Sequence, residues 1–143
     1  MDFEDRHLYY PLYFLYQSDL KLAIKKHLLD DKRENFCGFM VSNGSGDKIR
    51  GEFFEQLSEY KKVDSGGRYK NNIGGAFIKD KNAWLKNYKF NLCFENISCK
   101  GRISEKLIQA FAAGCVPIYC GSLNLLRYLR ISISLHLHSL LVL

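Results

Sequence analysis

The chain has 143 residues, 47% of them hydrophobic, which is enough apolar material for one ordinary domain with its own core. Its formal net charge of +6 favours an anionic partner, such as a nucleotide phosphate, a nucleic acid or an acidic membrane surface. The first ten residues are acidic and aromatic, which argues against a signal peptide, and the apolar stretch at residues 131–143 is too short to span a bilayer. If the protein meets a membrane, we expect it to do so peripherally, from one side.

The five cysteines predict buried apolar positions and no metal site. Their number is odd, four of them lie in or beside apolar runs, and neither a CxxC pair nor a paired histidine accompanies them. We therefore expect a protein of a reducing compartment whose cysteines mostly pack as small apolar residues. They are Cys37, Cys93, Cys99, Cys115 and Cys120.

The first part of the chain predicts a helix, a strand and a second helix. Residues 20–29 (LKLAIKKHLL) have helical spacing, with leucine and isoleucine beside lysines, and indicate a surface helix or connecting segment. Residues 36–42 (FCGFMVS) are a short apolar run ended by NGSGD, which is typical of a buried strand and a turn. Residues 47–62 return to helical spacing. Strand, glycine loop and helix are the first half of a βα unit.

The helix predicted at residues 47–62 has an expected start and an expected buried stripe. Asp47 is available as the N-cap residue. Ile49, Phe53 and Leu57 recur at helical spacing on one side, so we expect them to face the core.

The second part of the chain alternates strands and helices. We expect strands at 61–67, 89–96 and 115–120, a polar loop at 68–77, and helices at about 79–87 and 105–113. Ser104 is the expected N-cap of the last helix, and Gly114 its left-handed stop. This alternation predicts a doubly wound, Rossmann-like α/β fold with a parallel sheet and helices on both faces.

The tail changes character at about Gly121. Beyond it the chain is dominated by leucine, isoleucine and serine without clean periodicity, and no Asp or Glu occurs from Leu107 to the end. Two interpretations stay open, namely a genuine edge strand and helix, or out-of-frame translation appended to a shortened gene.

The start of the helix at 105–113 is a candidate anion site. Ligands of parallel sheets bind beyond the carboxyl ends of the strands, where helix N-termini present backbone N–H groups with partial positive charge. Lys106 adds a full charge there, although a lysine in the first turn is unfavourable to the helix itself. A bound anion would remove that conflict, and Glu105 could accept hydrogen bonds from ribose hydroxyls. An ordinary charged helix start is the alternative.

Arg50 raises a similar choice. It follows the NGSGD loop at the start of its helix, so its planar guanidinium could reach a phosphate at the same edge of the sheet. The alternative is a solvated surface arginine.

One long motif identifies a family. Residues 88–122 (YKFNLCFENISCKGRISEKLIQAFAAGCVPIYCGS) resemble the donor-binding motif of glycosyltransferase family 10, the α1,3/α1,4-fucosyltransferases. The upstream segments FCGFMVSN, YKKVDSGGRYKNNIGG and WLKNYKF resemble the bacterial members, which decorate lipopolysaccharide. The resemblance covers about residues 1–122.

The resemblance implies a division of the chain. Family members have the GT-B fold, two Rossmann-like halves with the active site between them. Residues 1–34 would then be a connecting segment from an N-terminal acceptor half, and residues 35–122 the GDP-fucose-binding domain of the C-terminal half. Residues 123–143 would be a divergent tail. We therefore expect a fragment of the complete enzyme.

The resemblance also implies roles for individual residues. Lys106 and Arg50 would bind the diphosphate, Glu105 the ribose, and Asn96 would line the donor pocket. Arg102 stands where the family commonly has a tyrosine near the base, and its guanidinium plane could stack on guanine. We expect no metal and no cofactor beyond the donor GDP-fucose. The general base is expected to lie outside this chain, so no catalytic residue is assigned here.

The function implied is transfer of L-fucose from GDP-fucose, with inversion, to an N-acetylglucosamine-containing glycan such as N-acetyllactosamine, in an α1,3 linkage. A non-catalytic GDP-sugar-binding or interaction module is the alternative. A nucleic-acid binder is disfavoured because no such motif is present and the basic residues are spread along the chain. The expected location is the cytoplasm or the cytoplasmic membrane face in a bacterium, and the Golgi in a eukaryote.

Overall fold

The fold is a parallel sheet with helices on both faces. A computed structural model describes residues 15–16, 18–19, 21, 32–97, 103–121 and 141–142. The strands are β1 (Asn35–Phe39), β2 (Val63–Ser65), β3 (Tyr88–Phe94), β4 (Val116–Cys120) and β5 (Leu141–Val142). All four neighbouring pairs are parallel, in the order β2-β1-β3-β4-β5. The predicted Rossmann-like α/β class is therefore confirmed.

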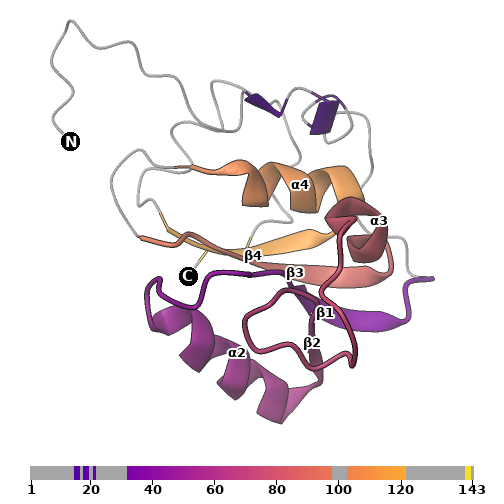
Figure 1. Cartoon of the computed structure of the whole chain (residues 1–143). Helices are drawn as coiled ribbons and strands as arrows, with labels where there is room; N and C mark the ends of the chain where they lie inside the picture. Colours follow the sequence, from indigo (N-terminus) through magenta and orange to yellow (C-terminus); the bar gives the residue numbers. More distant parts are fainter. Residues whose placement is uncertain are drawn as a thin grey trace, which may run out of the picture.

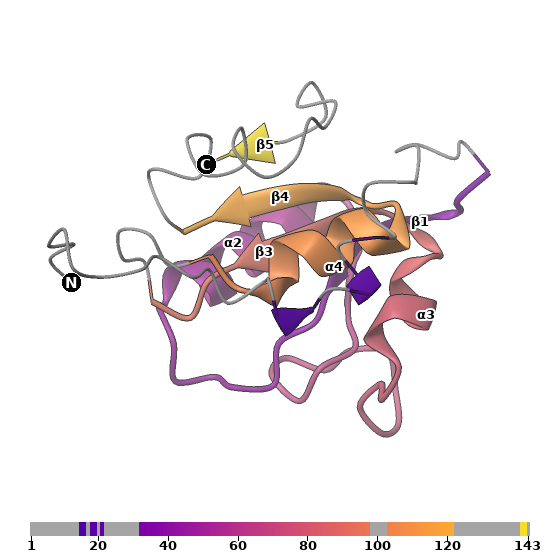
Figure 2. The same ribbon diagram turned by 90° about the horizontal axis from the view of Figure 1, so that it is seen from above.

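Three described helices form the outer layers. They are α2 (Ile49–Tyr60), α3 (Lys81–Leu85) and α4 (Glu105–Ala113). Helix α2 covers one face of the sheet, while α3 and α4 lie side by side on the other (Figure 1). In the view from above, α4 runs over β3 and β4, with α2 beneath the sheet (Figure 2). The sheet is thus buried on both sides, which explains why its central strands read as continuous apolar runs.

The central strand β3 divides the core into two clusters. Phe90, Leu92 and Phe94 pack in the cluster on the α2 face, whereas Tyr88 and Cys93 belong to the cluster beneath α3 and α4. The two-residue period of a strand explains why Cys93 faces away from Leu92 and Phe94. Tyr88 at the start of β3 departs from that period and packs against Trp84.

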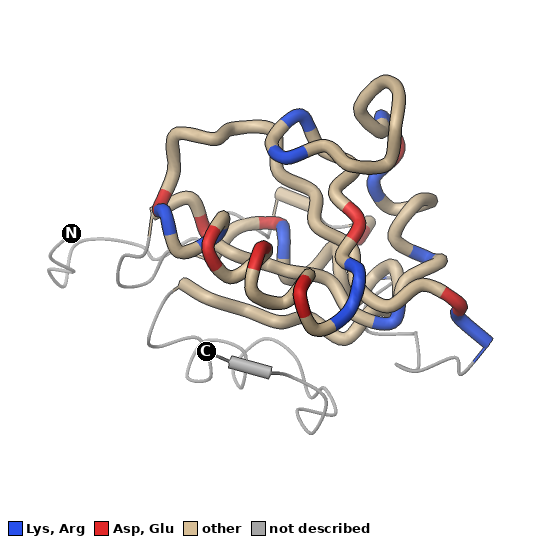
Figure 3. The backbone as a smooth tube through the Cα atoms, turned by 90° about the horizontal axis from the view of Figure 1, so that it is seen from below, with Lys and Arg blue, Asp and Glu red and all other residues tan. Residues whose placement is uncertain are grey.

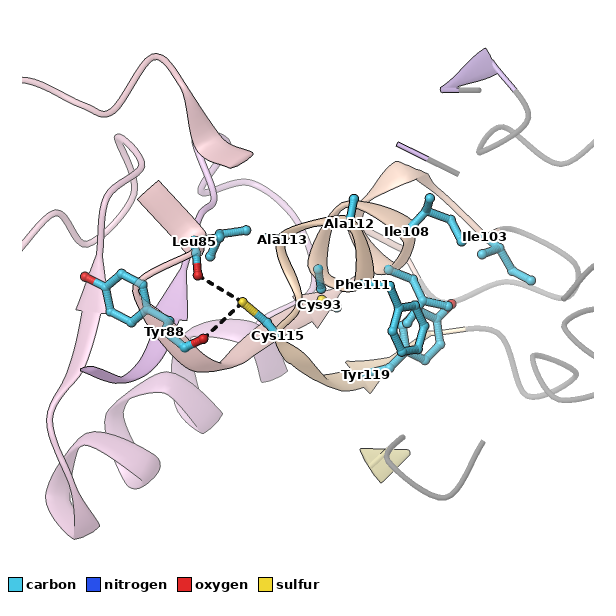
Figure 4. Close-up of a cluster of buried hydrophobic side chains, with 12 residues drawn as sticks. Leu85, Tyr88, Cys93, Ile103, Ile108, Phe111, Ala112, Ala113, Cys115 and Tyr119 are labelled. Atoms are coloured by element: carbon cyan, nitrogen blue, oxygen red, sulfur yellow. Dashed lines mark hydrogen bonds between the residues drawn. The ribbon is translucent and has the colours of Figure 1, made fainter. Parts of the chain in front are cut away.

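The cluster on the α3 and α4 face is shown in Figure 4. The thiol of Cys115 lies 3.1 Å from the carbonyl of Leu85 and 3.3 Å from that of Tyr88, so it ties the start of β4 to the end of α3 and the start of β3. Cys37 and Cys93 are also fully buried, as expected, while Cys120 is partly exposed and Cys99 lies outside the described residues.

Helix α4 has the predicted ends. The hydroxyl of Ser104 accepts a hydrogen bond from the backbone N–H of Lys106, and Gly114 adopts the left-handed conformation with φ 77°. A side chain would be strained at that angle, which is why glycine terminates the helix there.

The start of α2 differs by one residue from the prediction. Lys48, not Asp47, is the N-cap residue, and its side chain makes no capping hydrogen bond. Asp47 instead accepts a hydrogen bond from the backbone N–H of Ile49 through Oδ1, at 3.2 Å. Other contacts hold the loop before the helix, and the N-cap position moves by one residue, from Asp47 to Lys48.

The predicted buried stripe of α2 was partly wrong. Phe53 and Leu57 are partly buried against the core, but Ile49 is 43% exposed. The side of the helix that lies deepest contains Arg50 and Phe54, four residues apart. Arg50 is buried in place of its neighbour Ile49, which the apolar pattern assigned to the core. The buried side of the helix is therefore rotated relative to the expected one.

Two predictions fall outside the described residues. The helix expected at residues 20–29 has only residue 21 described, and residues 122–140 of the tail are not described. Strand β5 places residues 141–142 beside β4, with Ile118 opposite Leu141. Among the described residues, no helix is long and apolar enough to cross a membrane.

We predict that Phe54→Ala lowers the free energy of unfolding by about 3–5 kcal/mol. The substitution removes a buried ring that stacks on the ring of Phe39, with 5.1 Å between the two ring centroids. Tyr60→Ala on the same helix is the control, since that side chain is 81% exposed and its loss should cost less than about 1 kcal/mol. Chemical denaturation of both variants measures the difference. Equal losses would mean that α2 does not pack as described.

Candidate functional site

The strand order creates a topological switch point between β1 and β3. The chain leaves β1 towards β2 on one side and leaves β3 towards β4 on the other. In open parallel sheets, ligands bind outside the carboxyl ends of the strands where the connections diverge in this way. The loop after β1 and the loop after β3 therefore bound the expected binding crevice.

Arg50 and Asn96 meet at this switch point. Arg50 comes from the first turn of α2, and Asn96 is the second residue after β3. Nη1 of Arg50 donates to Oδ1 of Asn96 at 2.8 Å, across 46 residues of sequence. Two of the residues assigned to the donor site by resemblance are thus in direct contact.

The Arg50 guanidinium is buried without a counter-charge among the described residues. Its side chain is only 1% exposed, so the surface-arginine alternative is wrong. Besides the bond to Asn96, it donates to the carbonyl oxygens of Asn43 at 2.9 Å and Asp47 at 3.3 Å. All three acceptors are neutral, and a guanidinium has five N–H groups. A buried charge paired only with neutral groups is costly, so an anion that reached this edge of the sheet would relieve the cost.

Gly46 allows the loop after β1 to close over Arg50. A Cβ at Gly46 would lie 2.2 Å from Nη2 of Arg50 and 2.8 Å from the carbonyl oxygen of Asn96. The backbone N–H of Asp47 also donates to that carbonyl, at 2.9 Å. The loop, the arginine and the end of β3 thus form one hydrogen-bonded unit that has no room for a side chain at residue 46.

Lys106 and Glu105 lie at the N-terminus of α4, on the opposite face of the sheet from Arg50 (Figure 1). Nζ of Lys106 is 3.1 Å from Oγ of Ser104 and 3.7 Å from Oε1 of Glu105. The two side chains are only 16% and 23% exposed. The charged side chains at the start of α4 are therefore largely enclosed by the protein and not fully solvated.

Glu95 belongs to the site and was not identified from the sequence. It follows β3 directly and is 4% exposed. Its Oε1 accepts a hydrogen bond from the backbone N–H of Ser104 at 2.8 Å, and its Oε2 lies 3.6 Å from Nζ of Lys106. The signal that could have found it is an acid placed immediately after a buried parallel strand, at the sheet edge where ligands bind.

The thiol of Cys93, which contacts the start of α4, is unreactive. Burial raises the pKa of Cys93 to about 12, so its thiol is neutral near pH 7. Its sulfur accepts a hydrogen bond from Nδ2 of Asn91 at 3.0 Å and lies 3.4 Å from the carbonyl oxygen of Lys106. A neutral buried thiol is a poor nucleophile, so Cys93 supports the helix start by packing.

The remaining predicted residue cannot be placed. Arg102 lies outside the described residues, as do its neighbours 98–101. Within the described part of the chain, no three His, Cys, Asp or Glu side chains gather as a metal site would require.

We predict that Gly46→Ala lowers the free energy of unfolding by about 1–3 kcal/mol, because the added methyl group displaces Arg50 or the loop over it. The neighbouring exposed Ser45→Ala is the matched control and should change stability by less than about 0.5 kcal/mol. Equilibrium denaturation tests both variants. A neutral Gly46→Ala would show that the loop does not close on Arg50 as described.

A known protein family matches most of the chain. The family described as glycosyltransferase family 10 (fucosyltransferase), C-terminal part, matches residues 29–136. The match runs past residue 122, where the donor domain was expected to end. That boundary and the two interpretations of the tail therefore stay predictions.

Similar proteins are fucosyltransferases. The chain is 32% identical to the alpha-(1,3)-fucosyltransferase FucT of Helicobacter pylori, over 85% of this chain and 32% of that protein. It is 29% identical to the GDP-fucose protein O-fucosyltransferase 3 of Xenopus tropicalis, over 87% of this chain and 30% of that protein. A crystal structure of an α1,3-fucosyltransferase with GDP-fucose superposes with a TM-score of 0.70 at 31% identity, covering 85% of this chain and 46% of that one.

The chain thus spans about a third of the length of these curated relatives and about half of the solved structure. The family match covers most of the chain, and the fold of this chain superposes on that of the solved relative. The chain belongs to glycosyltransferase family 10, the fucosyltransferases.

Proposed function

We propose that this chain binds GDP-fucose at the carboxyl edge of its sheet and serves the transfer of L-fucose to an N-acetylglucosamine-containing glycan. The observation that carries the proposal is the buried guanidinium of Arg50, which meets only neutral oxygens among the described residues at the β1/β3 switch point. A solved relative with GDP-fucose bound, at 31% identity, supports the choice of donor.

Different site residues bind different parts of the donor. Arg50 and Lys106 approach the diphosphate from opposite faces of the sheet, and the N–H groups at the start of α4 add partial positive charge. Glu105 accepts hydrogen bonds from the ribose, and Asn96 orients Arg50 and lines the donor pocket. Arg102 stacks on guanine. The donor is held by these side chains without a metal.

The reaction places negative charge where these cations lie. The acceptor hydroxyl oxygen forms a bond to the anomeric carbon of fucose while the bond from that carbon to the β-phosphate oxygen breaks, which inverts the configuration and gives an α1,3 linkage. GDP leaves with the electron pair, and the hydroxyl proton passes to a general base outside this chain. Arg50, Lys106 and the helix N-terminus stabilise the charge that grows on the leaving phosphate.

A second candidate function is a GDP-sugar-binding module without catalysis. The same buried arginine and enclosed helix start would serve it, since both can hold a diphosphate whether or not transfer follows. A nucleic-acid surface has less support, because Lys and Arg are interspersed with Asp and Glu along the described backbone (Figure 3).

We predict that GDP-fucose binds saturably and that Arg50→Ala and Lys106→Ala each weaken binding by about 10-fold to 100-fold, the loss of one charge-assisted hydrogen bond. Isothermal titration calorimetry measures the affinities. Lys89→Ala is the charge-matched control, since Lys89 is exposed near the opposite end of β3 and should not matter. Unchanged affinity in both site variants of a folded protein would contradict the proposal.

Transfer separates the two candidate functions. Labelled GDP-fucose is incubated with N-acetyllactosamine and the chain, and the product is analysed for its linkage. Formation of the α1,3-fucosylated product supports catalysis. Saturable donor binding without transfer, even in the presence of a supplied N-terminal half of a family member, supports the binding module.

A further inference from the structure

We propose that Glu95 is a positioning residue, whose buried carboxylate holds the ammonium of Lys106 where it meets the donor diphosphate. The inference rests on the proposed donor site but concerns a residue that acts only through Lys106. No role for Glu95 follows from charge alone, because a carboxylate beside a phosphate site repels the ligand.

Glu95 is fixed by the ends of two strands. Its backbone N–H donates to the carbonyl oxygen of Cys120 at 2.9 Å, which extends the pairing of β3 with β4 by one residue. Gly121 packs closely against it, since a Cβ at that position would lie 2.6 Å from Cγ of Glu95. Its side chain is only 2% exposed. The carboxylate therefore has a single defined position.

The carboxylate links that fixed position to the start of α4. One oxygen accepts the backbone N–H of Ser104 at 2.8 Å, and the other faces Nζ of Lys106 at 3.6 Å. The ammonium is also within 3.1 Å of the Ser104 hydroxyl. An ammonium has three N–H groups, and the third partner in the structure is Glu105, so a ligand that takes Glu105 to its ribose would free one N–H group for its phosphate.

Lys106 needs such a partner to remain in the site. It lies in the first turn of α4, where the helix dipole repels a cation, and its side chain is only 16% exposed. Glu105 also lies nearby, at 3.7 Å, but the proposed function assigns it to the ribose. Glu95 is the carboxylate that stays beside the lysine when the donor is bound.

We expect the effect of Glu95 on GDP affinity to reverse when Lys106 is removed. While Lys106 is present, Glu95 improves GDP binding by holding the ammonium in place. When Lys106 is removed, the same carboxylate faces the diphosphate directly and weakens binding. A purely structural Glu95, which only accepts the Ser104 N–H, would affect GDP binding equally in both backgrounds.

A double-mutant cycle with GDP as the probe tests this directly. Glu95→Gln keeps an acceptor for the Ser104 N–H and removes the charge. We expect it to weaken GDP binding by about tenfold in the wild-type background and to strengthen binding in the Lys106→Ala background. The exposed Glu59→Gln, at the far end of α2, controls for the loss of one negative charge and should change GDP affinity little in either background.

A second variant keeps the test decisive if Glu95→Gln does not fold. Gly121→Ala leaves the carboxylate charged, but the added methyl group would lie 2.6 Å from Cγ of Glu95 and 2.5 Å from the hydroxyl oxygen of Tyr119. The resulting shift of the carboxylate should weaken GDP binding only when Lys106 is present. Equal effects in both backgrounds, or tighter binding with Lys106 in place, would overturn the role of Glu95 while leaving the donor site intact. A folded wild-type chain that does not bind GDP would overturn the proposed function and the inference together.

Discussion

The hydrogen bond between Arg50 and Asn96 is the contact on which the site depends. It joins the first turn of α2 to the end of β3 and so fixes the two loops that diverge at the switch point of the sheet. The same guanidinium holds the loop after β1 through two carbonyl oxygens. A buried charge with only neutral partners among the described residues lowers the stability of the fold by itself, and a bound anion reverses that cost. Under the proposed function, the donor diphosphate supplies that anion.

The two faces of the sheet carry different halves of the site. The α2 face supplies the rigid, buried arginine, whereas the α4 face supplies a lysine held between hydroxyl and carboxylate partners. Both cations lie at the carboxyl edge because all strands run in the same direction. Under the proposed function, the two cations approach the diphosphate from opposite faces of the sheet. This arrangement suits a reaction in which the diphosphate departs with added charge.

Local patterns in the sequence were enough to predict α4 and the strands around it. Ser104 and Gly114 mark the ends of that helix through short-range hydrogen bonds and backbone conformation, which a local sequence pattern can reveal. The strand order could not be predicted, because it depends on contacts between distant segments. The sequence left the burial of Arg50 undecided, because an apolar stripe containing Ile49 was expected to face the core instead. Glu95 was not identified from the sequence, because its partners come from another loop and helix.

The most direct test of a diphosphate site at the switch point is hydrogen–deuterium exchange of the chain with GDP and with guanosine. We expect GDP to slow amide exchange in residues 43–50 and 103–107 together, guanosine not to do so, and Lys106→Ala to reduce the effect in both segments. Protection by GDP at another part of the fold, or equal protection by guanosine at these two segments, would contradict it.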